Sequence, residues 1–250
     1  MKFDPFGDFE TAGYLRNIYQ LTDLNVVKRL EHSSFESNIE QALAYLADVE
    51  TIDYTSILTV HQMLFMSIYP WAGQDRMVVT PELRITKGRK GEPGYTEFAD
   101  AEDIRLAAEY AIGLAGKYAR FRDRPGEVMG ALALAHPFLD GNGRTILLIY
   151  TELCHRAGFS INWSHTTKDG YLAALSAEIL DPRKQLLDTY LKPHVVNAVS
   201  RKDWPALIGG IQGLDGLDKE DLVYQKIDGS APKRQYRGYL VQAVGRADEP

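Results

Sequence analysis

Apolar residues recur with helical spacing along most of the first 200 positions, and this pattern predicts a mainly α-helical protein. The first predicted helix is capped by Thr22 or Asp23 and continues to Leu46. A second helix begins at Asp53 or Thr55, because either side chain can cap the apolar run that follows. Each helix carries its apolar residues in one stripe, so each should bury one face.

The most apolar stretch of the chain is predicted to be a buried central helix that ends at Gly158. Its apolar residues cover every side of the helix and are Ile146, Leu147, Leu148, Ile149, Tyr150, Leu153 and Cys154. The preceding helix begins at Pro125 and stops at His136, because Pro137 disfavours the helical conformation in the residue before it. Weaker helical patterns cover residues 100–119, 169–179 and 186–191.

Residues 77–99 have a different character and contain the one clear β pattern. Residues 77–80 and 83–88 are predicted as short strands, with turns at Pro81 and Gly88. The polar segment 87–94 that follows is consistent with a solvated loop and equally with a loop that contacts a ligand.

The two ends of the chain differ from the helical middle. Residues 1–20 are rich in aromatic side chains and interrupted by Pro5, Gly7 and Gly13, which predicts an extended arm against the domain. After Arg201 glycines become frequent and long apolar stripes disappear, so we expect one domain over residues 1–200 and an appendage over 201–250.

The appendage itself carries weak signals. Residues 204–208 can form a short helix. The alternation of apolar and polar residues over 239–244 is weak, and it is consistent with a strand and equally with no regular structure. Its role cannot be read from the sequence.

Composition narrows the class of protein. The chain has 250 residues, 45% of them hydrophobic, 25% charged, and a net charge of -6 that argues against direct nucleic-acid binding. Its single cysteine, Cys154, lies in the apolar central helix and should pack as a small hydrophobic residue. No stretch approaches the length of a membrane span, and the N-terminus lacks the apolar run of a signal peptide. We therefore expect a cytoplasmic protein with no membrane partner.

The turn before the central helix has the residue types of a phosphate site. The first backbone N–H groups of a helix lack intrahelical partners, so Gly141, Asn142 and Gly143 should form a cradle for an anion. Arg144 adds a permanent positive charge, and Asp140 offers the hard oxygen ligand that Mg²⁺ prefers. His136 at the preceding helix end is a base of suitable pKa.

The nine residues from His136 to Arg144, His-Pro-Phe-Leu-Asp-Gly-Asn-Gly-Arg, resemble the signature of the Fic (filamentation induced by cAMP) family. A second Fic hallmark precedes it, because residues 61–65 and then 69–76 are similar to the segment found there in the family. The opening residues 4–6 and 13–17 also resemble Fic toxins whose antitoxin is a separate small protein. The resemblance covers about residues 4–199.

The resemblance implies a Fic-type helical bundle around the central helix, with a short β-hairpin flap over residues 77–99. It implies a protein nucleotidyl transferase of the AMPylation type, acting as a toxin or as an effector delivered to a host or neighbouring cell. The donor is ATP or another nucleotide, bound with Mg²⁺. The target is a protein with a serine, threonine or tyrosine hydroxyl, and a small antitoxin protein can act in trans.

Site residues follow from the same resemblance. His136 would be the catalytic base, residues 141–144 would bind phosphate, and Asp140 would hold the metal. In the family the flap binds the target segment as an added strand, which an exposed strand edge can do through its unpaired backbone groups. The flap residues expected to contact the target are Ile85, Thr86, Lys87 and Gly88. Phe138 would anchor the loop in the core.

The sequence departs from the family pattern at one position and in one segment. Many relatives carry a second arginine three residues after the first, and this chain has Leu147 there. The change leaves the donor open between ATP, UTP, GTP and a phosphate or phosphocholine donor, and keeps a non-catalytic Fic-shaped binding module as an alternative. The inhibitory motif of some relatives has serine or threonine four residues before a glutamate, and glycine or asparagine directly after it. Residues 33–38 match this motif only weakly, because Glu36 is followed by serine and the residue four positions before it is His32. We expect no built-in inhibitory helix.

His61 lies on an apolar stripe of the second predicted helix. A histidine in such a position is expected to be a core residue with a satisfied hydrogen bond, not a ligand.

Overall fold

The computed structural model describes residues 4–6, 15–90, 94–211, 213–214 and 222–226. Its longer helices are α2 (Leu24–Asp48), α3 (Tyr54–Phe65), α5 (Ile104–Ala115), α7 (Pro125–Ala135), α8 (Asn142–Arg156) and α9 (Lys168–Leu180). Its shorter helices are α4 (Arg76–Val79), α6 (Tyr118–Asp123), α10 (Leu186–Leu191) and α11 (Trp204–Gly209). The mainly α-helical fold predicted from the sequence is confirmed.

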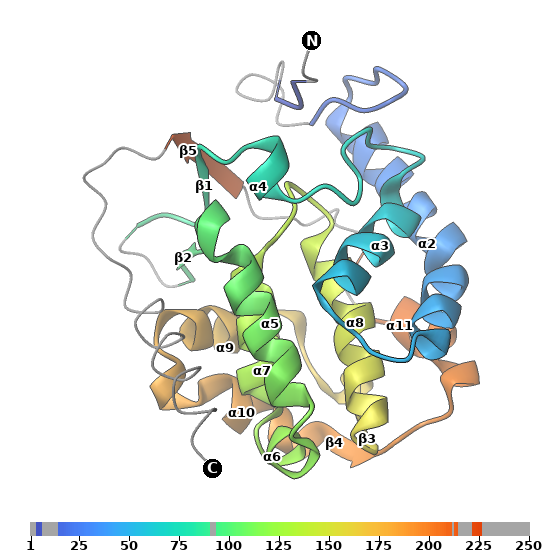
Figure 1. The fold of residues 1–250 in the computed structure, drawn as a ribbon, viewed down its shortest axis with the longest axis vertical. Helices are drawn as coiled ribbons and strands as arrows, with labels where there is room; N and C mark the ends of the chain where they lie inside the picture. Colours follow the sequence, from blue (N-terminus) through green and yellow to red (C-terminus); the bar gives the residue numbers. More distant parts are fainter. Residues whose placement is uncertain (1–3, 7–14, 91–93, 212, 215–221, 227–250) are drawn as a thin grey trace.

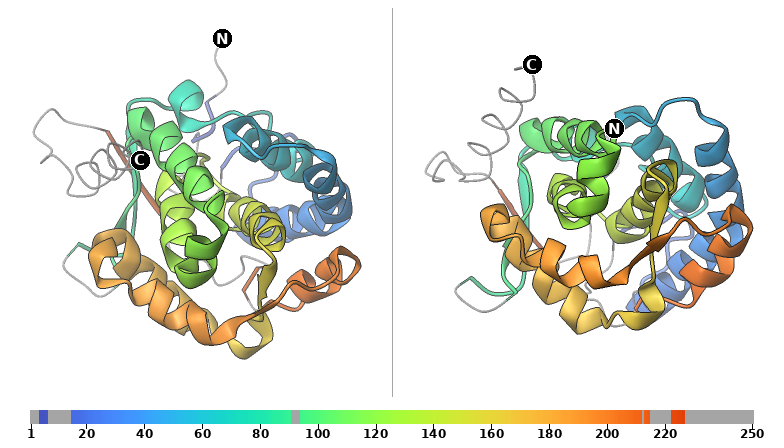
Figure 2. Two further views of the ribbon diagram at one scale, coloured as in Figure 1. Left: turned by 60° about the horizontal axis from the view of Figure 1, so that its bottom comes forward. Right: turned by 90° about the horizontal axis from the view of Figure 1, so that it is seen from below.

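Helix α8 lies at the centre of the bundle. Figure 1 shows α5 and α7 on one side of it and α3 and α2 on the other. Figure 2, which includes a view from below, shows α9, α10 and α11 around the remaining sides. Ile149 and Tyr150 are fully buried, and the Tyr150 hydroxyl donates to the carbonyl of Pro125 at 3.0 Å. The predicted buried central helix is therefore confirmed.

Cys154 packs inside α8, as expected. Its side chain is buried, and burial raises the pKa of the thiol well above its usual value. A thiol in this environment stays protonated and unreactive.

Aspartates begin the first two helices. Asp23 accepts hydrogen bonds from the backbone of Asn25 and Val26, which caps α2. Asp53 accepts from the backbone of Ser56, whose hydroxyl in turn accepts from the Asp53 N–H in a capping box. The structure thus selects aspartate from each pair of caps that the sequence left open.

The strands among the described residues form two small sheets. One has the order β2 (Thr96–Glu97), β1 (Leu83–Lys87) and β5 (Leu222–Lys226), and the other pairs β3 (Phe159–Ile161) with β4 (Val195–Asn197). All pairings are antiparallel. The hairpin of β1 and β2 confirms that the flap region contains a short β-hairpin. The sequence pattern did not predict β3, β4 or β5.

The predicted strand over residues 77–80 is wrong, because this segment is helix α4. The Asp75 side chain accepts a hydrogen bond from the backbone of Val78 at 3.2 Å, and its carbonyl accepts from Val79 at 3.0 Å. A capped helical turn therefore satisfies the backbone here, which outweighs the strand propensity of the two valines.

Both ends of the described chain pack against the bundle. In the N-terminal arm, Leu15 is buried and the backbone N–H of Ile18 donates to the carbonyl of Ile68 at 2.8 Å. Beyond residue 200, Trp204 is buried and Arg201 forms an ion pair with the buried Glu152 at 2.7 Å. The weak strand pattern at 239–244 lies outside the described residues, and the boundary near residue 200 stays a prediction. None of the helices in the described ranges has the length and hydropathy to span a bilayer.

Candidate functional site

His136 follows the last residue of α7 in the left-handed conformation, with φ of 40° and ψ of 58°. Pro137 disfavours the right-handed helical conformation in the residue before it, and α7 stops there. The imidazole stacks on Phe98, with ring centroids 3.7 Å apart and an interplanar angle of 19°. Backbone conformation and ring stacking together hold this side chain in one orientation at the edge of a cleft.

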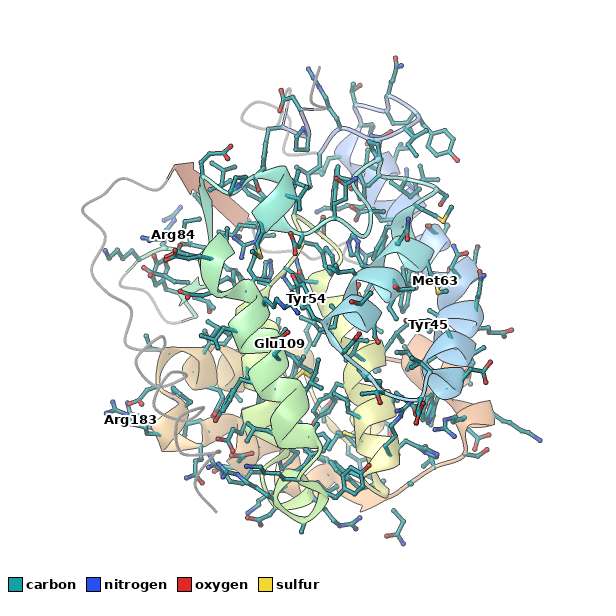
Figure 3. All side chains as sticks on the ribbon, in the orientation of Figure 1. Tyr45, Tyr54, Met63, Arg84, Glu109 and Arg183 are labelled. Carbon is teal, nitrogen blue, oxygen red and sulfur yellow. The ribbon has the colours of Figure 1, made fainter. Side chains whose placement is uncertain are left out.

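Arg76 ties the histidine to the flap. Its guanidinium is buried and donates to the carbonyl of His136 at 2.8 Å and to that of Ala99 at 2.7 Å. Its backbone N–H donates to the carbonyl of Pro137 at 2.8 Å. The neighbouring Asp75 accepts a hydrogen bond from the hydroxyl of Tyr54 at 2.6 Å. Tyr54 is labelled in Figure 3, between α3 and α5. A fixed Arg76 therefore sets the distance between the histidine loop and the flap.

Asn142 closes the loop that follows the histidine. Its side chain accepts from the N–H of Phe138 at 2.9 Å and donates to the carbonyl of the same residue at 2.8 Å. Phe138 is fully buried and stacks on His61 with centroids 3.6 Å apart. The side-chain amide of Asn142 thus forms its hydrogen bonds within the loop, and Phe138 anchors that loop in the core.

His61 holds the same loop from the other side. Its Nδ1 accepts from the N–H of Gly73 at 2.9 Å, so its Nε2 carries the proton and donates to the carbonyl of Asp140 at 3.0 Å. Complete burial lowers the pKa of His61 to about 3, which keeps the ring neutral. The expectation of a core histidine with satisfied hydrogen bonds is confirmed.

Gly141 and Gly143 give the loop room for a ligand. Gly141 has a φ of 76°, and a Cβ there would lie 2.5 Å from the ring of Phe65, so a larger residue would displace the loop. A Cβ on Gly143 would meet no atom within 4 Å, because this residue is exposed at the first turn of α8. The first N–H groups of α8 have no intrahelical partner, and the helix dipole favours an anion at this turn.

Arg144 places a buried positive charge beside this turn. Its Nη2 lies 3.4 Å from Oε2 of Glu31 and 3.9 Å from Oδ1 of Asp140, and its guanidinium stacks over Phe65. Its Nη1 is buried and has no hydrogen-bond partner among the described residues. A buried guanidinium N–H without an acceptor is costly, so the site fits an anionic ligand that supplies one.

Asp140 is the carboxylate nearest to the cradle. It accepts a hydrogen bond from the N–H of Gly141 at 2.5 Å and lines the cleft. Within the described part of the chain no cluster of three or more histidine, cysteine or acidic side chains could enclose a metal ion. One carboxylate fits Mg²⁺, which usually keeps several waters and takes its other ligands from substrate phosphates.

The cleft has a volume of about 700 Å³. His136, Asp140, residues 141–144, Leu147 and Lys87 line it together. Further lining residues come from α9 and the segment before it: Trp163, Ser164, Thr166, Thr167, Lys168, Asp169, Tyr171, Leu172, Leu175, Ser176 and Ile179. Its size suits a nucleotide-sized ligand.

The four flap residues do not share one environment. Ile85 and Thr86 are buried, and Lys87 is partly buried and lines the cleft. Gly88 ends the strand with a φ of 72°. Of the four, Lys87 alone reaches the cleft. One edge of β1 is covered in the described structure, because β5 pairs with β1 along its whole length, whereas β2 pairs only with Thr86 and Lys87 on the other edge.

Several residues of the site carry no recognisable sequence signal. Glu31 lies on α2 and reaches Arg144, 113 positions away in the chain. Phe98 supports His136 from the flap, and the apolar wall of α9 has an ordinary helical pattern. Arg76 and Phe65 stood within a recognised hallmark, but their contacts with His136 and Arg144 could not be predicted from it.

The candidate site thus combines a histidine at a helix end, an adjoining glycine turn at the start of a buried helix and a nearby hairpin. Residues 51–154 match the model of the Fic/DOC family. The chain is 31% identical over 169 residues to the probable protein adenylyltransferase y4lH of Sinorhizobium fredii, covering 64% of this chain and 81% of that protein. This chain belongs to the Fic/DOC family.

Other relatives are longer. Protein adenylyltransferase VbhT of Bartonella schoenbuchensis is 31% identical over 177 residues, a match that covers 66% of this chain and 34% of VbhT. The chain thus corresponds to about a third of that relative.

Solved structures share the fold. The Bartonella tribocorum effector BepC, with bound AMPPNP, has a TM-score of 0.60 at 19% identity and covers 75% of this chain and 95% of its own. The Fic domain of a Bartonella quintana effector, with bound ADP, has a TM-score of 0.59 at 20% identity, with coverages of 78% and 96%.

Proposed function

We propose that the protein is a nucleotidyl transferase of the AMPylation type, which transfers a nucleoside monophosphate from a triphosphate donor to a protein hydroxyl. The observation that carries this proposal is that His136, the glycine turn and the unpartnered Nη1 of Arg144 meet at one cleft. The names of VbhT and y4lH as adenylyltransferases support it.

The donor would lie with its α-phosphate against the N–H groups of residues 141–143. Arg144 would supply its Nη1 to a phosphate oxygen, which gives this buried N–H its acceptor. Mg²⁺, held by Asp140 and the donor phosphates, would neutralise charge on the leaving group. The apolar wall of α9 would cover the nucleoside.

In the transfer step, His136 removes the proton from the target hydroxyl. The hydroxyl oxygen forms a bond to the α-phosphorus while the bond to the bridging oxygen of the β-phosphate breaks, and pyrophosphate leaves. Phe98 and Arg76 hold the imidazole and its loop in place before the reaction. Such preorganisation supplies most of the rate in phosphoryl-type transfers.

The donor is proposed to be ATP, with UTP, GTP or a phosphate or phosphocholine donor as the alternative within the same site. Leu147 lines the cleft where many relatives carry a second arginine, and its side chain cannot bind phosphate. Loss of one charge-assisted hydrogen bond weakens donor binding by roughly tenfold or more, which still permits catalysis.

The partner is proposed to be a protein with a serine, threonine or tyrosine hydroxyl, in the cytoplasm of the producing cell or of a cell that receives the enzyme. A small antitoxin protein acting in trans is part of the same proposal.

Labelled ATP, UTP and GTP, each incubated with the protein and a cell lysate, test the donor and the reaction. We expect protein labelling from ATP with wild type and none with His136→Ala, and an intact-mass increase equal to an adenylyl group. Labelling from UTP or GTP alone would reassign the donor. Absence of labelling from every donor, including phosphate and phosphocholine donors, would leave the binding module as the better interpretation.

A further inference from the structure

One edge of the flap strand β1 is paired along its whole length in the described structure. Strand β2 pairs only with its end, at Thr86 and Lys87. Strand β5 pairs with all five residues of β1 on the other edge, from Leu83 opposite Lys226 to Lys87 opposite Leu222. Figure 1 shows β5 alongside β1, although more than 130 residues separate them in the chain.

Tyr224 fastens β5 to the catalytic loop. It lies opposite Ile85, and its hydroxyl donates to the carbonyl of Leu139 at 2.9 Å, directly before Asp140. Its ring contacts Phe6 of the N-terminal arm edge to face, with centroids 4.9 Å apart. Burial and the negative charge of Asp140 raise the pKa of this hydroxyl well above its usual value. An aromatic side chain therefore reaches from the flap edge to the loop that carries the site.

Leu222 enters the cleft from the same strand. It lines the cleft beside Lys87, its partner in the pairing of β5 with β1. Side chains two residues apart on a strand share a face, so Leu222 and Tyr224 both project toward the site. Val223 between them is 38% exposed and faces away.

We propose that β5 is an intramolecular occupant of the edge to which a protein target would add, so that a target must displace it before transfer. The inference rests on the proposed function. It assigns to the target an extended segment whose backbone replaces β5 on β1 and whose side chains replace Leu222 and Tyr224. The target is thus expected to present an apolar or aromatic residue at these two positions.

The competition favours β5 in the resting protein. A segment of the same chain acts at an effective concentration on the order of millimolar, far above that of most cellular proteins. A target strand can therefore pair with β1 only in the fraction of molecules in which β5 has dissociated from β1. Weakening the pairing of β5 with β1 should raise the rate of transfer to all targets.

The test uses the full chain with Tyr224→Ala, which removes the hydrogen bond to Leu139 and the contact with Phe6. Val223→Ala, in the same strand but with an outward side chain, is the matched control. Hydrogen exchange of the amides of residues 83–87 reports the pairing, and labelled-donor transfer to lysate proteins reports access. We expect Tyr224→Ala to speed exchange and transfer by roughly fivefold to tenfold, and the control to match wild type.

A second variant tests the opposite change. Thr86→Cys with Val223→Cys places two cysteines on directly paired residues, within the Cα separation that a disulfide accepts. Oxidation should lock β5 on β1 and suppress transfer, and reduction should restore it. Cys154 is buried and remains outside this exchange.

If hydrogen exchange is unchanged in Tyr224→Ala, the proposed role of β5 is wrong. The same holds if both variants transfer at the wild-type rate while His136→Ala abolishes transfer. Either result leaves the proposed function intact. No transfer by wild type or by either variant with any donor would overturn both. The His136→Ala control thus separates the two failures.

Discussion

Arg144 and Glu31 form a buried ion pair, with Nη2 of the arginine 3.4 Å from Oε2 of the glutamate and both side chains at most 6% exposed. The other carboxylate oxygen of Glu31 accepts from the hydroxyl of Tyr69. This pairing compensates the positive charge of Arg144 and limits the directions in which its guanidinium can turn.

Glu31→Ala should therefore lower the free energy of unfolding by about 3 kcal/mol, because it leaves a buried guanidinium and a buried tyrosine hydroxyl without this acceptor. Urea unfolding of wild type and variant measures the difference. Glu36→Ala, on the exposed side of the same helix, is the control and should change stability by less than about 0.5 kcal/mol. Equal losses in both variants would contradict a specific role for Glu31.

His61 makes stability depend on pH. The folded imidazole has a pKa of about 3 because it is fully buried, whereas the unfolded one has its usual value of 6.5. The unfolded state therefore takes up a proton as the pH falls below 6.5, and the folded state does not until about pH 3. Stability is fully present above pH 6.5 and declines by roughly 4 kcal/mol as the pH falls through this window.

His61→Phe should remove this contribution to the pH dependence while lowering stability at pH 7 by about 2 kcal/mol, because Gly73 and Asp140 lose their partner. Denaturant unfolding of both proteins from pH 7 to pH 4 gives the comparison. A variant curve as steep as that of wild type would assign the acid sensitivity to other groups.

Glu178 has the opposite effect on pH dependence. Burial raises the pKa of its carboxyl from 4.5 to about 7, and its Oε1 has no hydrogen-bond partner among the described residues. The raised pKa means that stability is fully present below pH 4.5 and is lost as the pH rises through about 7. Glu178→Gln should raise stability at pH 8 by roughly 2 kcal/mol after allowance for solvent screening, and leave it nearly unchanged at pH 4.5. An equal change at both pH values would rule out ionisation as the cause.

His136 and Asp140 should differ as mutants. His136→Ala is expected to keep donor binding within about twofold and to lose transfer by roughly 10² to 10⁴-fold, because a general base acts on the barrier and not on the donor. Asp140→Ala should lose Mg²⁺-dependent donor binding together with transfer. Calorimetric titration with nucleotide, with and without Mg²⁺, separates them. Donor binding as weak in His136→Ala as in Asp140→Ala would make the histidine a phosphate or structural ligand.

Leu147→Arg tests the departure from the family pattern. A guanidinium at this cleft position should tighten binding of a triphosphate by roughly tenfold, about 1.4 kcal/mol, and leave a monophosphate nearly unchanged. Leu147→Met keeps the apolar character and serves as the control. Equal affinities of the arginine variant and wild type for the triphosphate would place the γ-phosphate away from this residue.

The sequence by itself determined most of the helices and the loop before α8. The stop of α7 at His136 follows from Pro137, and the all-apolar helix and the starts of α2 and α3 to within two residues follow from local rules of the chain. These features could be predicted because their causes lie within a few residues of one another. The proximity of His136 to residues 140–144 also follows from a short turn, so the centre of the candidate site was predictable.

The tertiary structure alone decided what surrounds that centre. Glu31 meets Arg144 and Tyr224 meets Leu139 only after distant segments pack, and no periodicity records such a pair. Helix α4 lies where a strand was predicted. Its cap, Asp75, accepts a hydrogen bond from Tyr54 of α3, and the backbone N–H of Arg76 donates to the carbonyl of Pro137, two contacts between distant segments. Strand β5 pairs with β1 through backbone hydrogen bonds. Nearly every residue type can form such bonds, so the sequence carries little signal for this pairing. The occupied edge of the flap is therefore a property of the fold and not of the signature.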